Sequence, residues 1–188
     1  MEIRIEKIAS PKAKPEDESK LGFGHIFTDH MFIMDYDAGK GWHDARIVPF
    51  GDISISPASM VLHYAQEIFE GLKAYRTPDG GIQFFRPVEN FKRLNVSAER
   101  LVIPQLPVED GLKALHTLVE LDKDWVPSAE GTSLYIRPFI FADDPYIGVR
   151  PAEHYYFMII MSPSGAYYAS GLDPVGIYVE TNYVRSVK

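Results

Sequence analysis

The sequence predicts an α+β fold, in which flanking helices cover an antiparallel sheet. Segments with the residue pattern of strands stand on both sides of a pair of helical segments instead of alternating with helices, and this order is typical of α+β rather than doubly wound folds. Two pairs of these strands are joined by short turn-forming segments, as in antiparallel hairpins. A chain of 188 residues with 46% hydrophobic residues is also long enough to bury a core of its own.

The first fifty residues predict a short strand and a hairpin. Ile3 and Ile5 alternate with charged residues, which indicates a strand. The polar, proline-containing stretch 10–20 is typical of a loop. Strand-like segments at 31–36 and 45–50 then flank a glycine-containing stretch, and together they suggest a hairpin.

The next segment predicts a helix and a second hairpin. Ser56 suits the N-cap of a helix and Pro57 its first turn, and we expect this helix to end at Gly71. Strands at 72–77 and 82–86 follow, joined by the turn sequence Pro-Asp-Gly-Gly. This is the clearest hairpin in the chain.

Two amphipathic helices come after the second hairpin. The first begins after Pro87 and the second after Pro107, and each has apolar residues at helical spacing. The residues expected to face inward are Phe91, Leu94, Ala98 and Leu101 in the first helix, and Leu112, Leu115, Leu118 and Val119 in the second.

The last third of the chain predicts two buried strands and a domain boundary. The strands are expected at 133–141 and 154–161, and a third strand at Pro174–Glu180. Between them, small and turn-forming residues indicate a linker. We therefore expect a small α+β domain over 1–161, an interdomain loop over 162–173 and the start of a larger domain over 174–188.

Composition excludes several classes of function. The net charge is −7 and no run of Lys or Arg exceeds two residues, so the basic surface that nucleic-acid binding requires is not expected. There are no cysteines, which excludes disulfides and thiolate zinc sites. The six histidines form no metal-binding pair with a carboxylate at helical spacing, so no metal site is expected.

The sequence also predicts a cytoplasmic protein without a membrane segment. The start, MEIRIEKIAS, is too charged for a secretory signal. The longest apolar run, Tyr155–Met161, is far too short to span a bilayer.

Arg137 is an arginine in the middle of an otherwise apolar strand, and its position needs an explanation. Period-two geometry places Tyr135, Arg137, Phe139 and Phe141 on one face of a strand, where an arginine is costly without an anionic partner. One explanation is an internal ion pair with Asp or Glu. The other is an arginine at the floor of a cleft, which binds a carboxylate with the Tyr135 hydroxyl beside it.

Three further residues are ordinary when taken singly. Arg93 lies off the apolar face of its helix, about 100° from Leu94, and by itself reads as a solvated surface residue. Tyr64 and Phe69 lie in the expected helix and need no special explanation.

Six long motifs at unbroken spacing change these interpretations. They are FTDHM, GWHDARIVPF, LHYAQEIFEGLKAYR, FFRPVENFKRL, DKDWVPSAEGTSLYIRPFIFADDPYIGVRP and SPSGAYYASG. From Gly22 onward the chain closely resembles the branched-chain amino acid aminotransferases, which are pyridoxal-phosphate enzymes of fold type IV. The resemblance implies the small domain of that fold, followed by the first strand of the large domain.

The resemblance also implies roles for the charged and hydroxyl-bearing residues. Arg93 matches the arginine that binds the phosphate of pyridoxal 5'-phosphate. Tyr64 matches a tyrosine at the substrate carboxylate and the cofactor. Tyr135 and Arg137 match the pair that receives the side-chain carboxylate of glutamate.

Five more residues match the walls of the substrate pocket. Phe69 and Phe23 match aromatic residues of the apolar pocket, and Tyr167 matches a residue of the interdomain loop that covers it. Ile147 and Val149 match a loop that reaches the neighbouring subunit's pocket, so a homodimer is implied. The implied substrates are branched-chain amino acids, glutamate and their 2-oxo acids.

The matching lysine of the family is not expected within this chain. In the family, a segment like Tyr183-Val184-Arg185 precedes a glycine-rich stretch and then the lysine that binds the cofactor, and Lys188 does not match that lysine. We therefore expect an amino-terminal portion of such an enzyme, inactive alone. The alternatives are a stand-alone small domain that acts as a binding or dimerisation module, or a related D-amino-acid transaminase or aminodeoxychorismate lyase.

Overall fold

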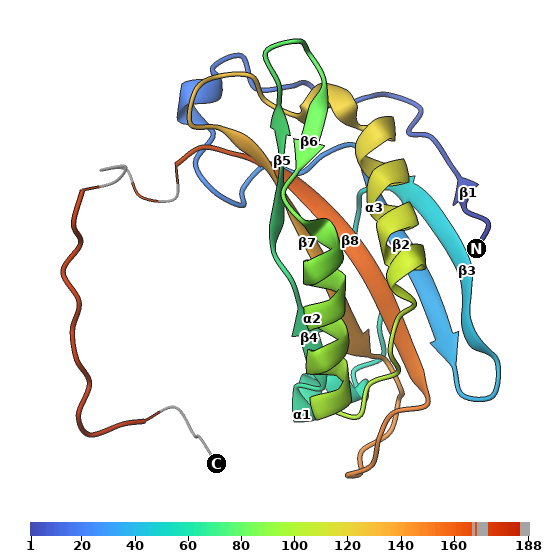
Figure 1. The fold of residues 1–188 in the computed structure, drawn as a ribbon. Helices are drawn as coiled ribbons and strands as arrows, with labels where there is room; N and C mark the ends of the chain where they lie inside the picture. Colours follow the sequence, from blue (N-terminus) through green and yellow to red (C-terminus); the bar gives the residue numbers. More distant parts are fainter. Residues whose placement is uncertain (167, 169–172, 185–188) are drawn as a thin grey trace.

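The computed structural model describes residues 1–166, 168 and 173–184. This part of the chain forms an eight-stranded sheet in the order β1-β3-β2-β8-β7-β5-β6, with β4 also paired to β7 (Figure 1). Every pairing is antiparallel except the one between β1 and β3, which is parallel. The strands are β1 Arg4–Ile5, β2 His30–Asp37, β3 Gly41–Pro49, β4 Glu67–Phe69, β5 Leu72–Arg76, β6 Ile82–Phe84, β7 Ser133–Ala142 and β8 His154–Ser164. The expected α+β architecture is confirmed.

Helices α2 (Pro87–Arg100) and α3 (Val108–Leu121) lie side by side over one face of the sheet. They bury the predicted apolar residues Phe91, Leu94, Ala98, Leu115, Leu118 and Val119. Gly111 permits this close packing, because a Cβ there would stand 2.5 Å from the Phe91 ring. Leu101, expected on the same inward face, is instead 40% exposed. That prediction was wrong because α2 ends at Arg100 and Leu101 leaves helical geometry.

Strands β7 and β8 form the longest pairing, from Ser133 opposite Ser164 to Ala142 opposite Tyr155. Alternation along β7 is as the sequence predicts, because Leu134, Ile136 and Ile140 are fully buried while Tyr135 and Arg137 are partly exposed. The register of β7 therefore directs a tyrosine and an arginine to the same side of the sheet, away from the helices. Strand β8 continues to Ser164, three residues past its expected end at Met161.

The helix expected from Ser56 to Gly71 is mostly absent. Helix α1 has five residues, Met60–Tyr64, and ends at Ala65 with a left-handed φ of 50°. Ser56 does not cap it; its hydroxyl accepts the Ala58 N–H at 3.1 Å in a preceding turn. Residues 67–69 instead form β4, because pairing with β7 satisfies their backbone groups, with Phe69 opposite Phe139. Tertiary pairing overrides the helical pattern here.

The strand expected at Pro174–Glu180 does not form. These residues are extended but unpaired and run away from the body of the molecule (Figure 1). A strand needs a neighbour that accepts and donates backbone hydrogen bonds, and the described residues offer none to this segment. In the described ranges, the remaining short elements are 3₁₀ turns at Glu18–Lys20 and Lys123–Trp125. No helix in these ranges combines the length and apolar character that crossing a membrane requires.

Candidate functional site

Arg137 lies among aromatic side chains. Its Nη2 donates a hydrogen bond to the Tyr135 hydroxyl at 2.8 Å, and its Cζ stands 4.2 Å from the centroid of the Phe69 ring. The Tyr135 ring meets the Phe23 ring edge-on, with centroids 4.9 Å apart. The structure thus brings together Phe23, Phe69, Tyr135 and Arg137, which come from three separate parts of the sequence.

Among the residues that the structure describes, no carboxylate pairs with Arg137. Across residues 1–166, 168 and 173–184, the ion pairs involve other arginines, lysines, histidines and the amino terminus, and none includes Arg137. The internal ion pair considered from the sequence is therefore not found in this part of the chain. A hollow of about 180 Å³ lies in front of the guanidinium. Its lining is Phe23, Gly24, Phe27, Tyr135, Arg137, Ile160, Met161 and Ser162. An apolar chamber with one cation at its edge suits both an aliphatic chain and a carboxylate.

Arg93 is held by a buried glutamate that the sequence analysis did not single out. Its Nε and Nη2 donate to the two carboxylate oxygens of Glu70 at 2.6 and 2.7 Å. Glu70 is 4% exposed, whereas the Arg93 side chain is 67% exposed. Asn90 Nδ2 donates to the same carboxylate at 2.9 Å. Burial acts to raise the pKa of Glu70, but hydrogen bonds from Arg93 and then Asn90 outweigh it and leave the pKa below its ordinary value.

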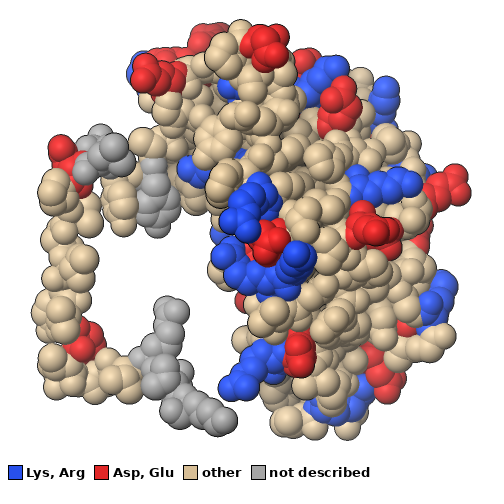
Figure 2. Space-filling model, viewed as in Figure 1, with Lys and Arg blue, Asp and Glu red and all other residues tan. Residues whose placement is uncertain are grey.

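A second hollow, of about 430 Å³, opens in front of Arg93. Its charged lining consists of the cations Lys73, Arg86 and Arg93 and the acid Glu89. Lys and Arg side chains gather over the start of α2, with acidic groups between them (Figure 2). Such a concave, cationic surface at the beginning of a helix suits a phosphate group.

Three consecutive residues connect the two hollows. Phe69 packs on Arg137, Glu70 binds Arg93, and Gly71 lies against the Tyr135 hydroxyl. The chain stays paired to β7 just past the end of β4, since the Glu70 N–H donates to the Pro138 carbonyl, and the exposed Phe69 and the buried Glu70 side chains point to opposite faces. The short strand missed in the sequence is therefore the element that organises the site.

The remaining predicted residues lie elsewhere. Tyr64, on α1, is 40% exposed, and Ile147 and Val149 project from the β7–β8 loop with exposures of 70% and 92%. None of the three lines either hollow. Tyr167 falls outside the residues that the structure describes.

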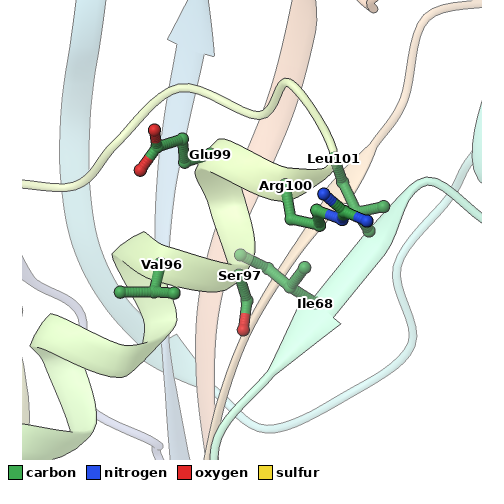
Figure 3. A pocket seen from close by; sticks show the side chains of 6 residues that line it. All are labelled: Ile68, Val96, Ser97, Glu99, Arg100 and Leu101. Carbon is green, nitrogen blue, oxygen red and sulfur yellow. The ribbon is translucent and has the colours of Figure 1, made fainter. Parts of the chain in front are cut away.

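A third hollow, larger than the two above, is a separate feature. It measures about 760 Å³ and lies between the last turns of α2 and strand β4 (Figure 3). Ile68, Ser97 and Arg100 border it, and no residue predicted for the site does. Over the described ranges, no group of three His, Asp or Glu side chains is arranged to hold a metal ion.

Comparison with known proteins places this geometry in context. No protein-family model matches the chain. The chain is 54% identical over 186 residues to "Branched-chain-amino-acid aminotransferase 2" of Bacillus subtilis (strain 168), covering 99% of this chain and 51% of that protein. It thus spans about half the length of the curated relatives it matches.

Solved structures share the fold, among them the following two. Branched-chain amino acid aminotransferase of Escherichia coli superposes with a TM-score of 0.58 and 27% identity, over 74% of this chain and 41% of that one. A second branched-chain amino acid aminotransferase, from the organism abbreviated T.th., was solved in complex with N-(5'-phosphopyridoxyl)-L-glutamate. It superposes with a TM-score of 0.52 and 28% identity, over 69% of this chain and 40% of that one.

Proposed function

This chain belongs to the branched-chain amino acid aminotransferase family, and from that premise we propose the activity of the whole protein. It transfers the amino group of leucine, isoleucine or valine to 2-oxoglutarate, and the products are the branched 2-oxo acid and glutamate. Pyridoxal 5'-phosphate is the cofactor. The lysine that binds it is proposed to lie outside this chain, so the 188 residues alone are expected to be inactive.

One observation carries the proposal: Arg137 stands at the edge of an apolar hollow without a carboxylate partner in the described residues. The two amino-acid substrates differ in their side chains, one aliphatic and one acidic. An aliphatic side chain gains free energy by leaving water against the apolar lining of the hollow, such as Phe23 and Phe27. Phe69, which packs on Arg137, is proposed to border the same pocket. The glutamate side chain gains a charge-assisted hydrogen bond from Arg137, with the Tyr135 hydroxyl beside it.

The residues around Arg93 fit the cofactor phosphate. A phosphate carries two negative charges at neutral pH, and the second hollow has cations at Lys73, Arg86 and Arg93. The T.th. relative was solved with a phosphopyridoxyl group joined to L-glutamate, so a cofactor of this class and glutamate are bound together in that protein. When bound, such a cofactor supplies an electron sink for the carbon that loses its proton. We propose that Arg93 holds the phosphate and that Tyr64 contacts the cofactor and the substrate carboxylate.

The remaining predicted residues complete this proposal. Ile147 and Val149, exposed on their loop, are proposed to reach the pocket of a second subunit in a homodimer. Tyr167 is proposed to lie in the interdomain segment that covers the pocket. A cytoplasmic location is likewise proposed for the whole protein.

The substrate preference of the whole protein tests the proposal. The purified whole protein, supplied with pyridoxal 5'-phosphate and 2-oxoglutarate, should convert L-leucine far faster than D-alanine. It should not act on aminodeoxychorismate. A preference for D-alanine would support a D-amino-acid transaminase, and turnover of aminodeoxychorismate would support the lyase. A whole protein without any of these activities would support a stand-alone binding module.

A further inference from the structure

Glu70 is a buried acid whose side chain is not explained by its backbone contact. It follows the last residue of β4, and its backbone N–H donates to Pro138 at 2.8 Å, as any residue there could do. A carboxylate that is 4% exposed is costly to bury unless it is paired. Its pairing is two hydrogen bonds from Arg93 and one from Asn90.

The geometry of the pair leaves one edge of Arg93 available. A guanidinium has five N–H groups in a planar fork. Glu70 takes the Nε edge, through Nε and Nη2. The outer edge, formed by Nη1 and the second hydrogen of Nη2, points away from Glu70, and Arg93 lines the cationic hollow. Arginine can bind two anions at once in this way, one on each edge.

Asn90 fixes the carboxylate in turn. Its Nδ2 donates to Glu70 at 2.9 Å and to the Gly71 carbonyl at 3.2 Å. The carboxylate is therefore held from α2 and from the backbone after β4, and it cannot rotate without breaking these contacts. A flexible, largely exposed arginine is thereby restricted to one orientation.

We propose that Glu70 is a positioning residue, which fixes Arg93 so that the outer edge of the guanidinium receives the phosphate of the cofactor. This inference rests on the proposed function. It assigns to Glu70 no contact with the cofactor or the substrate. Its effect is to remove the conformational freedom that Arg93 would otherwise lose when the phosphate binds.

The direction in which Glu70→Gln changes phosphate binding distinguishes a positioning role from a purely electrostatic one. Glu70→Gln removes a negative charge close to the phosphate, and Coulomb's law alone then predicts tighter phosphate binding. Loss of positioning predicts weaker binding, because the amide accepts through one oxygen and no longer holds both Arg93 nitrogens. The two effects have opposite directions, so the measured direction decides.

The experiment compares pyridoxal 5'-phosphate with pyridoxal, which lacks the phosphate. Equilibrium dialysis of the whole protein gives the two dissociation constants. The ratio used below is the dissociation constant of pyridoxal divided by that of pyridoxal 5'-phosphate, so a high ratio means a preference for the phosphate. We expect Glu70→Gln to weaken pyridoxal 5'-phosphate binding about tenfold and to leave pyridoxal binding nearly unchanged. Arg93→Ala should lower the ratio as well, and adding Glu70→Gln to it should not lower the ratio further, because no guanidinium is left to position.

Two comparison variants isolate the contact with Arg93. Glu67→Gln makes the same change on β4 at an exposed position and should keep the ratio. Glu89→Gln removes a charge from the hollow without touching Arg93, since Glu89 pairs with Lys92 at 3.0 Å, and it should strengthen phosphate binding. If Glu70→Gln does not fold, Asn90→Ala keeps the charge but frees the carboxylate, and it should lower the ratio.

The outcomes are distinguishable. If the unsubstituted protein prefers pyridoxal 5'-phosphate and Glu70→Gln retains or increases that preference, the role of Glu70 is overturned while the proposed function stands. Equal weakening for both ligands also overturns it, because a general structural role would act on both. If the unsubstituted protein shows no preference for the phosphate, the proposed cofactor site and the inference fail together.

Discussion

Gly71 and Tyr135 are so close that a Cβ on Gly71 would stand 2.5 Å from the Tyr135 hydroxyl oxygen. The same hydroxyl accepts a hydrogen bond from Arg137 at 2.8 Å. A hydrogen atom at position 71 is therefore a condition for the Tyr135–Arg137 pair. Glycine is needed at this position because the Tyr135 hydroxyl approaches the backbone closely. A left-handed backbone conformation is not the reason, since the φ of Gly71 lies outside that region.

Gly71→Ala should displace the Tyr135 hydroxyl and weaken its contact with Arg137. Under the proposed function, the glutamate half-reaction should lose about 0.5–1.5 kcal/mol relative to the leucine half-reaction, the value of one hydrogen bond. Single-turnover rates of the whole protein with each amino acid measure this difference. Gly51→Ala is the control, because nothing lies within 4 Å of a Cβ there. Equal losses for both amino acids would show that the close contact serves folding alone.

Arg137→Met should separate the two substrates further. The variant keeps an apolar side chain against Phe69 but has no charge for the glutamate side chain. We expect the glutamate half-reaction to lose about 1.5–3 kcal/mol and the leucine half-reaction to change little. Arg137→Lys, which keeps the charge without the planar fork, should fall between them. A similar loss with leucine would contradict the proposed role.

The sequence predicted the regular elements well because their patterns are local. The alternation in β7 and the turn between β5 and β6 depend on neighbouring residues. The same reasoning missed β4, since residues 67–69 become a strand through pairing with residues 139–141 of β7, about seventy residues away. It missed Glu70 for the same reason. The sequence signal that could have indicated Glu70 was an acid between an apolar stretch and a glycine. Its partner, Arg93, was already among the predicted site residues.

Stability should depend on pH through Glu70. Its pKa in the folded protein lies below the ordinary value of 4.5, so the folded state binds the proton more weakly than the unfolded state. Its contribution to stability is therefore complete above about pH 4.5 and is lost as pH falls through the lowered pKa. Urea unfolding at several pH values, on the unsubstituted chain and Glu70→Gln, tests this. The two unfolding free energies should converge as pH falls from the ordinary value of 4.5 through the lowered pKa of Glu70, and a constant difference would contradict it.

The segment 174–180 should promote self-association of the 188-residue chain. Ile177, Tyr178 and Val179 are 85%, 83% and 74% exposed, and an extended apolar segment with unpaired backbone groups pairs readily with another chain. Light scattering should show concentration-dependent growth in mass, which the double variant Ile177→Lys, Val179→Lys reduces. Identical monomeric behaviour of both chains would show that the segment is passive.

Asp122 should be among the most important residues for stability. It is 3% exposed, and its carboxylate accepts the backbone N–H of His30 at 2.9 Å and lies 2.6 Å from the His30 Nδ1. The other ring nitrogen, Nε2, accepts the backbone N–H of Ile8 at 2.9 Å, so the proton of the neutral ring is on Nδ1 and is donated to Asp122. One carboxylate, on the residue that follows α3, thus connects the end of this helix to β2 and, through His30, to the amino-terminal segment.

Asp122→Ala leaves two buried donors of His30 without an acceptor. We expect a loss of about 2–4 kcal/mol in the free energy of unfolding, because each buried unsatisfied group costs about 1–3 kcal/mol. Asp124→Ala is the matched control. Its side chain is 76% exposed and stands 3.7 Å from Lys14, so it should change stability by less than about 0.5 kcal/mol. Urea unfolding measures both variants. Limited proteolysis should also cut Asp122→Ala faster near Ile8, because the tautomer that accepts the Ile8 N–H is no longer fixed. Equal stability of the two variants would show that the His30 contacts are replaced by water or by other groups.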